Sequence, residues 1–128
     1  MPVAVLPDDA LVVRGGMNLP ENFTEGTGVV ISEEGLITGA SVNSAANVSL
    51  KKLIAADRRI GFKGILHGQI GVTTVGKIRD SGGDVVPSKS TNNPYHATLS
   101  GLTPEKASEL FRPTKPNPHK KRNRRGAK

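Results

Sequence analysis

Three side chains that can move a proton or hydrogen-bond a phosphate alternate along one short segment of this chain. The segment reads YHATLS (95–100), and an extended backbone would place His96, Thr98 and Ser100 on one face. Histidine changes its charge near neutral pH, and a neighbouring hydroxyl can orient a phosphate. This face is therefore either a site for acid–base chemistry or a hydrated sheet surface.

Two further residues could act with this face. In VVRGG (12–16), Arg14 ends an apolar β-rich run directly before two glycines. Glycine lets a backbone approach a phosphate closely, and arginine binds phosphate through two parallel hydrogen bonds. A turn with an exposed arginine is the alternative. His67, in LHGQ, is either a second catalytic imidazole or a hydrogen-bonded structural residue.

Histidine, hydroxyl groups and a cation can together cleave RNA without a metal ion. The imidazole takes the proton of the 2′-OH, while the cation and the hydroxyls stabilise the charge that develops on phosphorus-bound oxygens. We therefore expect a metal-independent ribonuclease that needs no cofactor, with catalytic residues His96, Thr98, Ser100, Arg14 and His67. A metal site is not expected, because the sequence has no cysteine and only three scattered histidines.

The net charge of +7 is concentrated at the C-terminus. Residues 112–128 hold eight basic side chains and no acid, whereas residues 1–111 hold ten basic and eleven acidic ones. A basic tail is typical of electrostatic binding to nucleic acid, and a solubilising end is the alternative. The predicted RNA contacts in this tail are Lys120, Lys121, Arg122, Arg124 and Arg125.

The secondary-structure elements that must position these residues are short. Strands are predicted over 10–16, 84–87 and 95–100, with a hairpin of 29–32 and 36–42. Capped helices are predicted over 50–59, 74–81 and 104–111, and residues 41–49 are expected to form a loop. Residues 61–72 fit either a strand or a loop. The pattern predicts one α+β domain over 1–111, with a small, mainly antiparallel sheet, and a disordered Pro-containing tail over 112–128.

The apolar runs of the chain are short. None approaches the roughly 18 residues that a membrane helix needs, and the first nine residues are too short and too acidic for a signal peptide. We expect a soluble cytoplasmic protein without a membrane partner.

Two enzyme families share parts of these motifs. Strand–Arg14–Gly resembles the opening motif of some ADP-ribosyltransferases, in which the arginine holds NAD, and SVNSA (41–45) resembles their second motif. That resemblance implies an NAD-using enzyme with Arg14, Ser44 and a glutamate, Glu105 or Glu109, in its site. RNA 2′-phosphotransferases of the same superfold are similar in another way, with a His-Gly strand, a helix, a His-containing strand and a second helix in this order.

Most of the chain, residues 8–118, also resembles a family of small single-domain bacterial proteins of unassigned activity. The shared segments are VVRGG, LPENF, SVNSA, GVTTVGKIRDSGGDVVP and NPYHATLSGLTPEKASELF. These proteins are similar to toxins of toxin–antitoxin and polymorphic-toxin systems, which implies an antitoxin or immunity protein as a partner. A non-catalytic module that binds nucleic acid through its basic tail is a third interpretation of the sequence.

Overall fold

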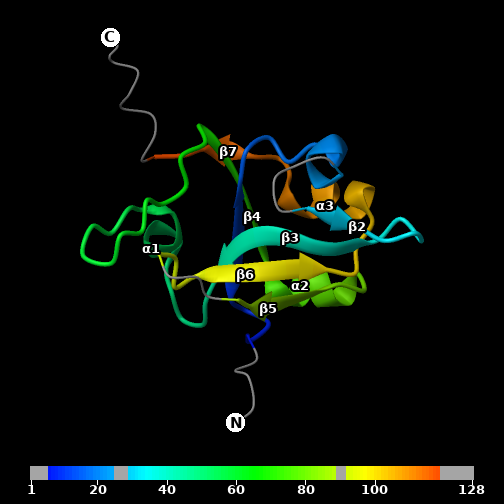
Figure 1. Cartoon of the computed structure of the whole chain (residues 1–128), viewed down its shortest axis with the longest axis horizontal. Helices are drawn as coiled ribbons and strands as arrows, with labels where there is room; N and C mark the ends of the chain where they lie inside the picture. The colour runs from blue at the N-terminus through cyan, green and yellow to red at the C-terminus, as the bar shows by residue number, and fades with distance from the viewer. Residues whose placement is uncertain (1–5, 25–28, 89–91, 119–128) are drawn as a thin grey trace.

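A seven-stranded antiparallel sheet and three helices make up the fold, which confirms the predicted α+β class (Figure 1). The computed structural model describes residues 6–24, 29–88 and 92–118. The strands are β1 (Leu11–Gly15), β2 (Val30–Ile31), β3 (Ile37–Ser44), β4 (Gln69–Thr74), β5 (Asp84–Pro87), β6 (His96–Ser100) and β7 (Lys115–Pro116). The helices are α1 (Leu50–Ile54), α2 (Val75–Asp80) and α3 (Pro104–Phe111), with a 3₁₀ turn, η1 (Pro20–Phe23).

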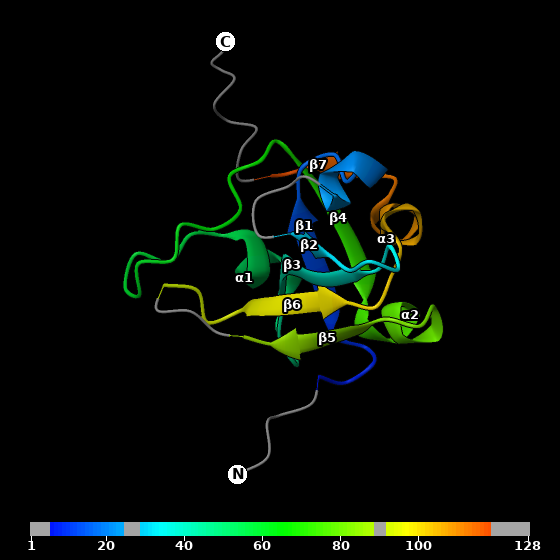
Figure 2. The same cartoon turned by 45° about the vertical axis from the view of Figure 1, so that its right-hand side comes forward.

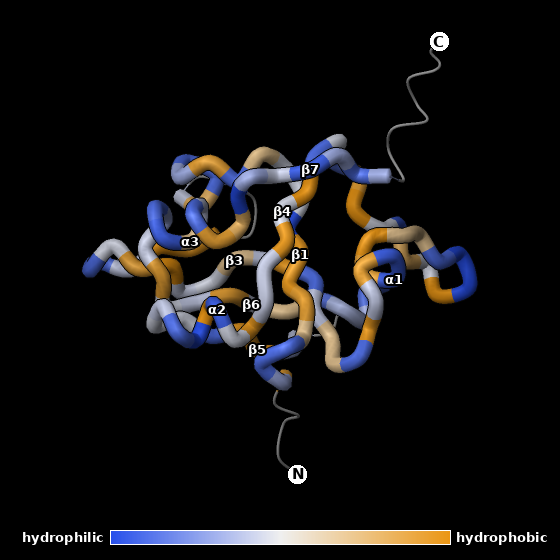
Figure 3. The backbone as a smooth tube through the Cα atoms, turned by 180° about the vertical axis from the view of Figure 1, so that it is seen from behind, coloured by the Kyte–Doolittle hydropathy of each residue, from blue (hydrophilic) through white to orange (hydrophobic). Residues whose placement is uncertain are grey.

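The strands lie in the order β5-β6-β3-β1-β4-β7, and β2 forms a hairpin with β3. Apolar side chains alternate along the central strands, so both faces of the sheet are covered. Val12 belongs to a core under α2 and α3, whereas Val13 belongs to a smaller core under α1. Figure 2 shows α1 well apart from α2 and α3, and Figure 3 shows the hydrophobic residues along β1 and β4.

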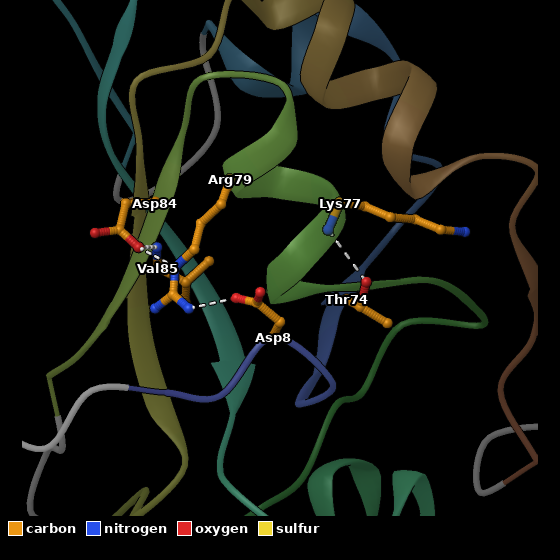
Figure 4. Close-up of polar contacts among 6 residues, drawn as sticks. All are labelled: Asp8, Thr74, Lys77, Arg79, Asp84 and Val85. Atoms are coloured by element: carbon orange, nitrogen blue, oxygen red, sulfur yellow. Dashed lines mark hydrogen bonds and ion pairs between the residues drawn. The ribbon is translucent and has the colours of Figure 1, made fainter.

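Hydroxyl side chains cap all three helices as the sequence predicts. Ser49, Thr74 and Thr103 each accept a hydrogen bond from the backbone N–H three residues later. Arg79 of α2 forms ion pairs with two aspartates, Asp8 at 2.7 Å and Asp84 at 3.1 Å (Figure 4). Because Asp84 lies on the edge strand β5, these ion pairs fix α2 to the edge of the sheet. These hydrogen bonds raise the pKa of Arg79, first through Asp8 and then through Asp84.

Three segments differ from the sequence prediction. Strand β3 continues to Ser44, two residues beyond the predicted strand 36–42, because β6 pairs with it as far as Asn43 and the Tyr95 carbonyl accepts from the Ser44 N–H at 2.8 Å. Helix α1 ends at Ile54, five residues earlier than predicted, because Ala55 is extended and the chain turns back through an Asp57–Phe62 bridge. Residues 115–116 of the predicted tail form β7, which pairs with Gln69 and Ile70 of β4.

The sheet opens between its two central strands. β1 pairs with β4 along all five of its residues but with β3 at Val12 and Val13 alone, while β3 pairs with β6 from Ala40 to Asn43. Beyond Val13, β1 therefore stays paired with β4 while β3 stays paired with β6, and the two strands are no longer paired with each other. Side chains take the place of strand pairing in that gap: Arg14 donates to the Ser41 carbonyl, and Asn18 donates to the Arg14 carbonyl.

Gly71 of β4 lies against α3, where a side chain would not fit. A Cβ atom there would collide with the Phe111 carbonyl oxygen and would lie 2.6 Å from Asn18 Nδ2. We expect Gly71→Ala to lower the free energy of unfolding by about 1–3 kcal/mol, measured by urea denaturation. Gly39→Ala is the control, because its Cβ would make only an ordinary 3.7 Å contact with Thr98. Equal stability of the two variants would contradict the close packing of α3 on β4.

Candidate active site

Two adjoining hollows occupy the gap between β1 and β3. One has a volume of about 350 Å³ and the other about 640 Å³. Arg14, Gly15, Ser41 and His67 line both of them. His96 lines the smaller hollow only, together with Asn43 and Asn93. We call the pair of hollows the groove; it has the concave shape and the few convergent polar groups that are typical of ligand sites.

Arg14 connects strand β1 to strand β3 where the two hollows adjoin. Its guanidinium donates to the Ser41 carbonyl at 2.8 Å and to the Asn22 carbonyl at 2.9 Å, and it lies 4.7 Å from the centre of the Phe23 ring. Burial lowers the pKa of Arg14, but a guanidinium remains protonated at neutral pH. The groove therefore contains a fixed, half-buried positive charge.

His96 is held in one orientation by hydrogen bonds at both ring nitrogens. Nδ1 lies 2.8 Å from the Ser88 hydroxyl and 3.1 Å from the Ser88 carbonyl, while Nε2 lies 3.1 Å from the Ser41 hydroxyl. A carbonyl oxygen can only accept, so we assign the proton of the neutral ring to Nδ1. The lone pair on Nε2 then faces Ser41 and the groove, which is the state that a general base requires.

His67 reaches the groove from the loop that precedes β4. Its side chain is exposed and lies close over Gly15, where a Cβ atom would collide with its ring. The first glycine after Arg14 therefore makes room for an imidazole of the protein, whereas the sequence interpretation assigned that room to a phosphate. His67 and Arg14, 53 positions apart in sequence, share both hollows.

Two asparagines fix the segment that leads into His96. Asn43 donates to the Leu53 carbonyl at 2.9 Å and accepts from Asn93 at 2.9 Å. Asn93 in turn accepts from the backbone N–H of Tyr95 at 2.9 Å. Helix α1, strand β3 and the start of β6 are thus connected through side chains next to the groove, which restricts the backbone that carries His96.

The structure brings together three of the five predicted catalytic residues. Arg14, His67 and His96 line the groove. Thr98 shares the face of His96 but contacts Ser88, at 2.9 Å, and does not line either hollow. Ser100 is four residues further along β6, about 13 Å from His96 at the usual strand rise, and pairs with Asp84.

The other predicted site residues do not enter the groove or lie beyond the described residues. Ser44 is buried and donates to the Leu11 carbonyl at 2.6 Å. Glu105 and Glu109 line a separate hollow beside α3. Ser44 and the two glutamates, which the ADP-ribosyltransferase resemblance places in an NAD site with Arg14, therefore do not line the hollows that Arg14 lines. The five predicted RNA contacts at 120–125 lie outside the described residues.

Sequence reasoning missed Ser41 and Ser88 as partners of His96. Both follow from strand pairing: Ser41 is opposite Thr98, diagonal to His96, and Ser88 directly follows β5, which pairs with β6. The sequence prediction ends the strand at Val42, which leaves Asn43 in the predicted loop. In the structure the strand continues, and both the Ser41 hydroxyl and the Asn43 amide lie on the face of His96.

None of the protein-family models, curated proteins or solved structures compared with the chain gives a significant match. Among residues 6–24, 29–88 and 92–118, no group of three or more histidine or acidic side chains is placed to hold a metal ion. Within the same part of the chain, no helix combines the length and apolar character that crossing a bilayer requires.

Proposed function

We propose that this chain is a metal-independent ribonuclease, and that the groove is its active site. The observation that supports this best is the convergence of two imidazoles and one guanidinium on the same hollow: His67, His96 and Arg14. No carboxylate of the described residues lines either hollow, so the charge of the groove favours an anionic ligand.

The proposed reaction is cleavage of the RNA strand by its own 2′-OH. His96 Nε2 removes the 2′-OH proton, and the resulting oxygen attacks the adjacent phosphorus. The bond from phosphorus to the 5′-oxygen breaks, and His67 as imidazolium donates its proton to that oxygen. Arg14 stabilises the added negative charge on the phosphate. The products are a 2′,3′-cyclic phosphate and a free 5′-hydroxyl.

The shape of the groove suits a dinucleotide step. The two hollows share one wall, which is formed by Arg14, Gly15, Ser41 and His67. If the scissile phosphate binds at this wall, each of the two nucleosides it joins can occupy one hollow. The phosphate would then lie beside the positive charge of Arg14. In the complex, the substrate 2′-OH takes the place of the Ser41 hydroxyl as the donor to His96.

The direct test is cleavage of a short single-stranded RNA by the purified chain in excess EDTA. We expect cleavage at an undiminished rate, with 2′,3′-cyclic phosphate ends identified by mass spectrometry. A DNA strand of the same sequence is the control and should stay intact because it lacks the 2′-OH. Intact RNA, or cleavage that EDTA abolishes, would contradict the proposal.

An ADP-ribosyltransferase-like, NAD-using enzyme is the second candidate, because the structure places Arg14 and Ser41 side by side on neighbouring strands at a two-part groove. In this alternative, Ser41 replaces Ser44 as the serine beside Arg14. NAD would raise the melting temperature, and release of nicotinamide without RNA cleavage would favour this candidate.

The proposed cellular role follows from the resemblance to toxins. A ribonuclease that degrades the RNA of its own cell without restraint would arrest growth, so the proposed toxin role implies an antitoxin or immunity protein as partner. Growth arrest with fragmented RNA on induction would support this role. Arrest with intact RNA would favour the NAD-using alternative, and RNA binding without arrest would favour a non-catalytic module.

A further inference from the structure

Residues 1–111 have nearly equal numbers of basic and acidic side chains, but these are unevenly distributed along the chain. Residues 51–63, which we call the basic segment, contain five basic side chains and one acid. They are Lys51, Lys52, Arg58, Arg59, Lys63 and the acid Asp57. The remainder of residues 1–111 therefore has an excess of acids. The segment comprises most of α1 and the loop that protrudes beyond it in both views (Figures 1 and 2).

The protruding loop is fixed to the body at its base. Asp57 and Phe62 exchange backbone hydrogen bonds of 2.8 and 3.0 Å, and Phe62 is buried with its ring 5.6 Å from that of Tyr95. The Ile65 N–H donates to the Ile54 carbonyl at 3.0 Å. The basic side chains are thus presented on a defined scaffold, next to the strand that carries His96.

Three of the cations gather around one hollow. It has a volume of about 420 Å³ and is lined by Lys52, Arg58, Arg59 and Tyr95, together with Asp57. Arg59 pairs with Asp57 at 3.2 Å, and its hydrogen bond lowers the pKa of that carboxyl, so the acid stays ionised and offsets one cation. Lys52 and Arg58 leave the hollow with a positive excess, beside an aromatic ring of the kind on which bases stack.

The hollow and the groove are neighbours in the fold. Tyr95 directly precedes His96, and Lys63 directly precedes the residues Gly64–His67 that line the groove. A polymer held in the groove would reach the hollow with its next nucleotides. We propose that Lys52, Arg58 and Arg59 form a phosphate-binding subsite for the RNA strand that continues from the scissile step. This inference rests on the proposed ribonuclease function.

Binding, measured separately from cleavage, tests this subsite. The full-length chain carrying His96→Ala is titrated with a labelled single-stranded RNA over a range of salt concentrations. The added substitutions Lys52→Gln, Arg58→Gln and Arg59→Gln should weaken binding about tenfold at low salt and reduce the slope of log K against log salt by about 1 to 2. The surface ion pair lost with Arg59 has little effect on folding, which a thermal melt checks.

The matched control removes the same charge elsewhere, with Lys77→Gln, Lys106→Gln and Arg112→Gln, all exposed on or beside α2 and α3. Its affinity and slope should equal those of His96→Ala alone. The proposal of a phosphate-binding subsite would be overturned by an equal loss of RNA affinity in both variants, or by no loss in either. Binding to anionic lipid vesicles in preference to RNA would also overturn it. If the variant with Lys52→Gln, Arg58→Gln and Arg59→Gln loses RNA binding but the wild type does not cleave RNA, the phosphate-binding subsite is supported and the ribonuclease function is refuted.

Discussion

Replacing His96 by alanine is expected to slow RNA cleavage by about 10³-fold, since a positioned general base contributes on the order of 10² to 10⁴. The side chain is only partly buried, and its hydrogen bonds run to Ser41 and Ser88 at the surface, so the fold should survive the change. The measurement is the single-turnover rate constant on a short RNA, with the melting temperature recorded on the same sample.

Two further variants make this result specific. His67→Ala should also slow cleavage, and the double variant should lose little beyond the slower single one, because an acid and a base that act in one step are not additive. Thr98→Val is the control: it keeps the strand and its face but removes a hydroxyl that contacts only Ser88 among the described residues. A rate for His96→Ala equal to that of Thr98→Val would make this face a hydrated sheet surface.

Replacing Phe111 by alanine should give the largest loss of stability, about 3–5 kcal/mol in the free energy of unfolding. Phe111 is completely buried at the end of α3 and stacks on Phe23, with the ring centres 5.9 Å apart. Phe23 in turn lies under Arg14. Chemical denaturation monitored by circular dichroism measures the loss, and RNA cleavage at low temperature should also decrease because Arg14 loses its support.

Val86→Ala is the matched comparison, since Val86 lies on β5 with 45% of its surface exposed. A truncation there should change the free energy of unfolding by less than about 0.5 kcal/mol. A cost below about 1 kcal/mol for Phe111→Ala would show that α3 does not pack on the sheet as described.

Local chemistry made several elements predictable from the sequence. Thr103 followed by Pro104 and Glu105 marks the start of α3, and the alternation of YHATLS marks β6, because caps and period-two patterns depend on neighbouring residues only. The structure has both elements at the predicted positions. It also brings Arg14, His67 and His96 together, as a shared catalytic role requires.

Other features depended on partners that are distant in sequence. Asn43 and Ser44 are small and polar, which is typical of a loop, and they belong to a strand because partners distant in sequence pair with them: His96 of β6 with Asn43, and Val12 of β1 with Ser44. The roles of Ser41 and Ser88 require that pairing. Strand β7, Lys115–Pro116, lies in a proline-rich segment and is likewise predictable only once the edge of β4 is known. The contact between Gly15 and His67 also joins residues distant in sequence, so it could not be predicted from the residues next to Gly15.

The two cores of the sheet are unequal, and this affects how the molecule opens. Among the described residues, fifteen buried apolar side chains pack on the face of α2 and α3, but only four on the face of α1. A partial opening that lifts α1 therefore costs less free energy than global unfolding. It would withdraw the Leu53 carbonyl from Asn43, and with it the connection that holds the approach to His96. On warming, the groove should lose its order while most of the sheet is still intact.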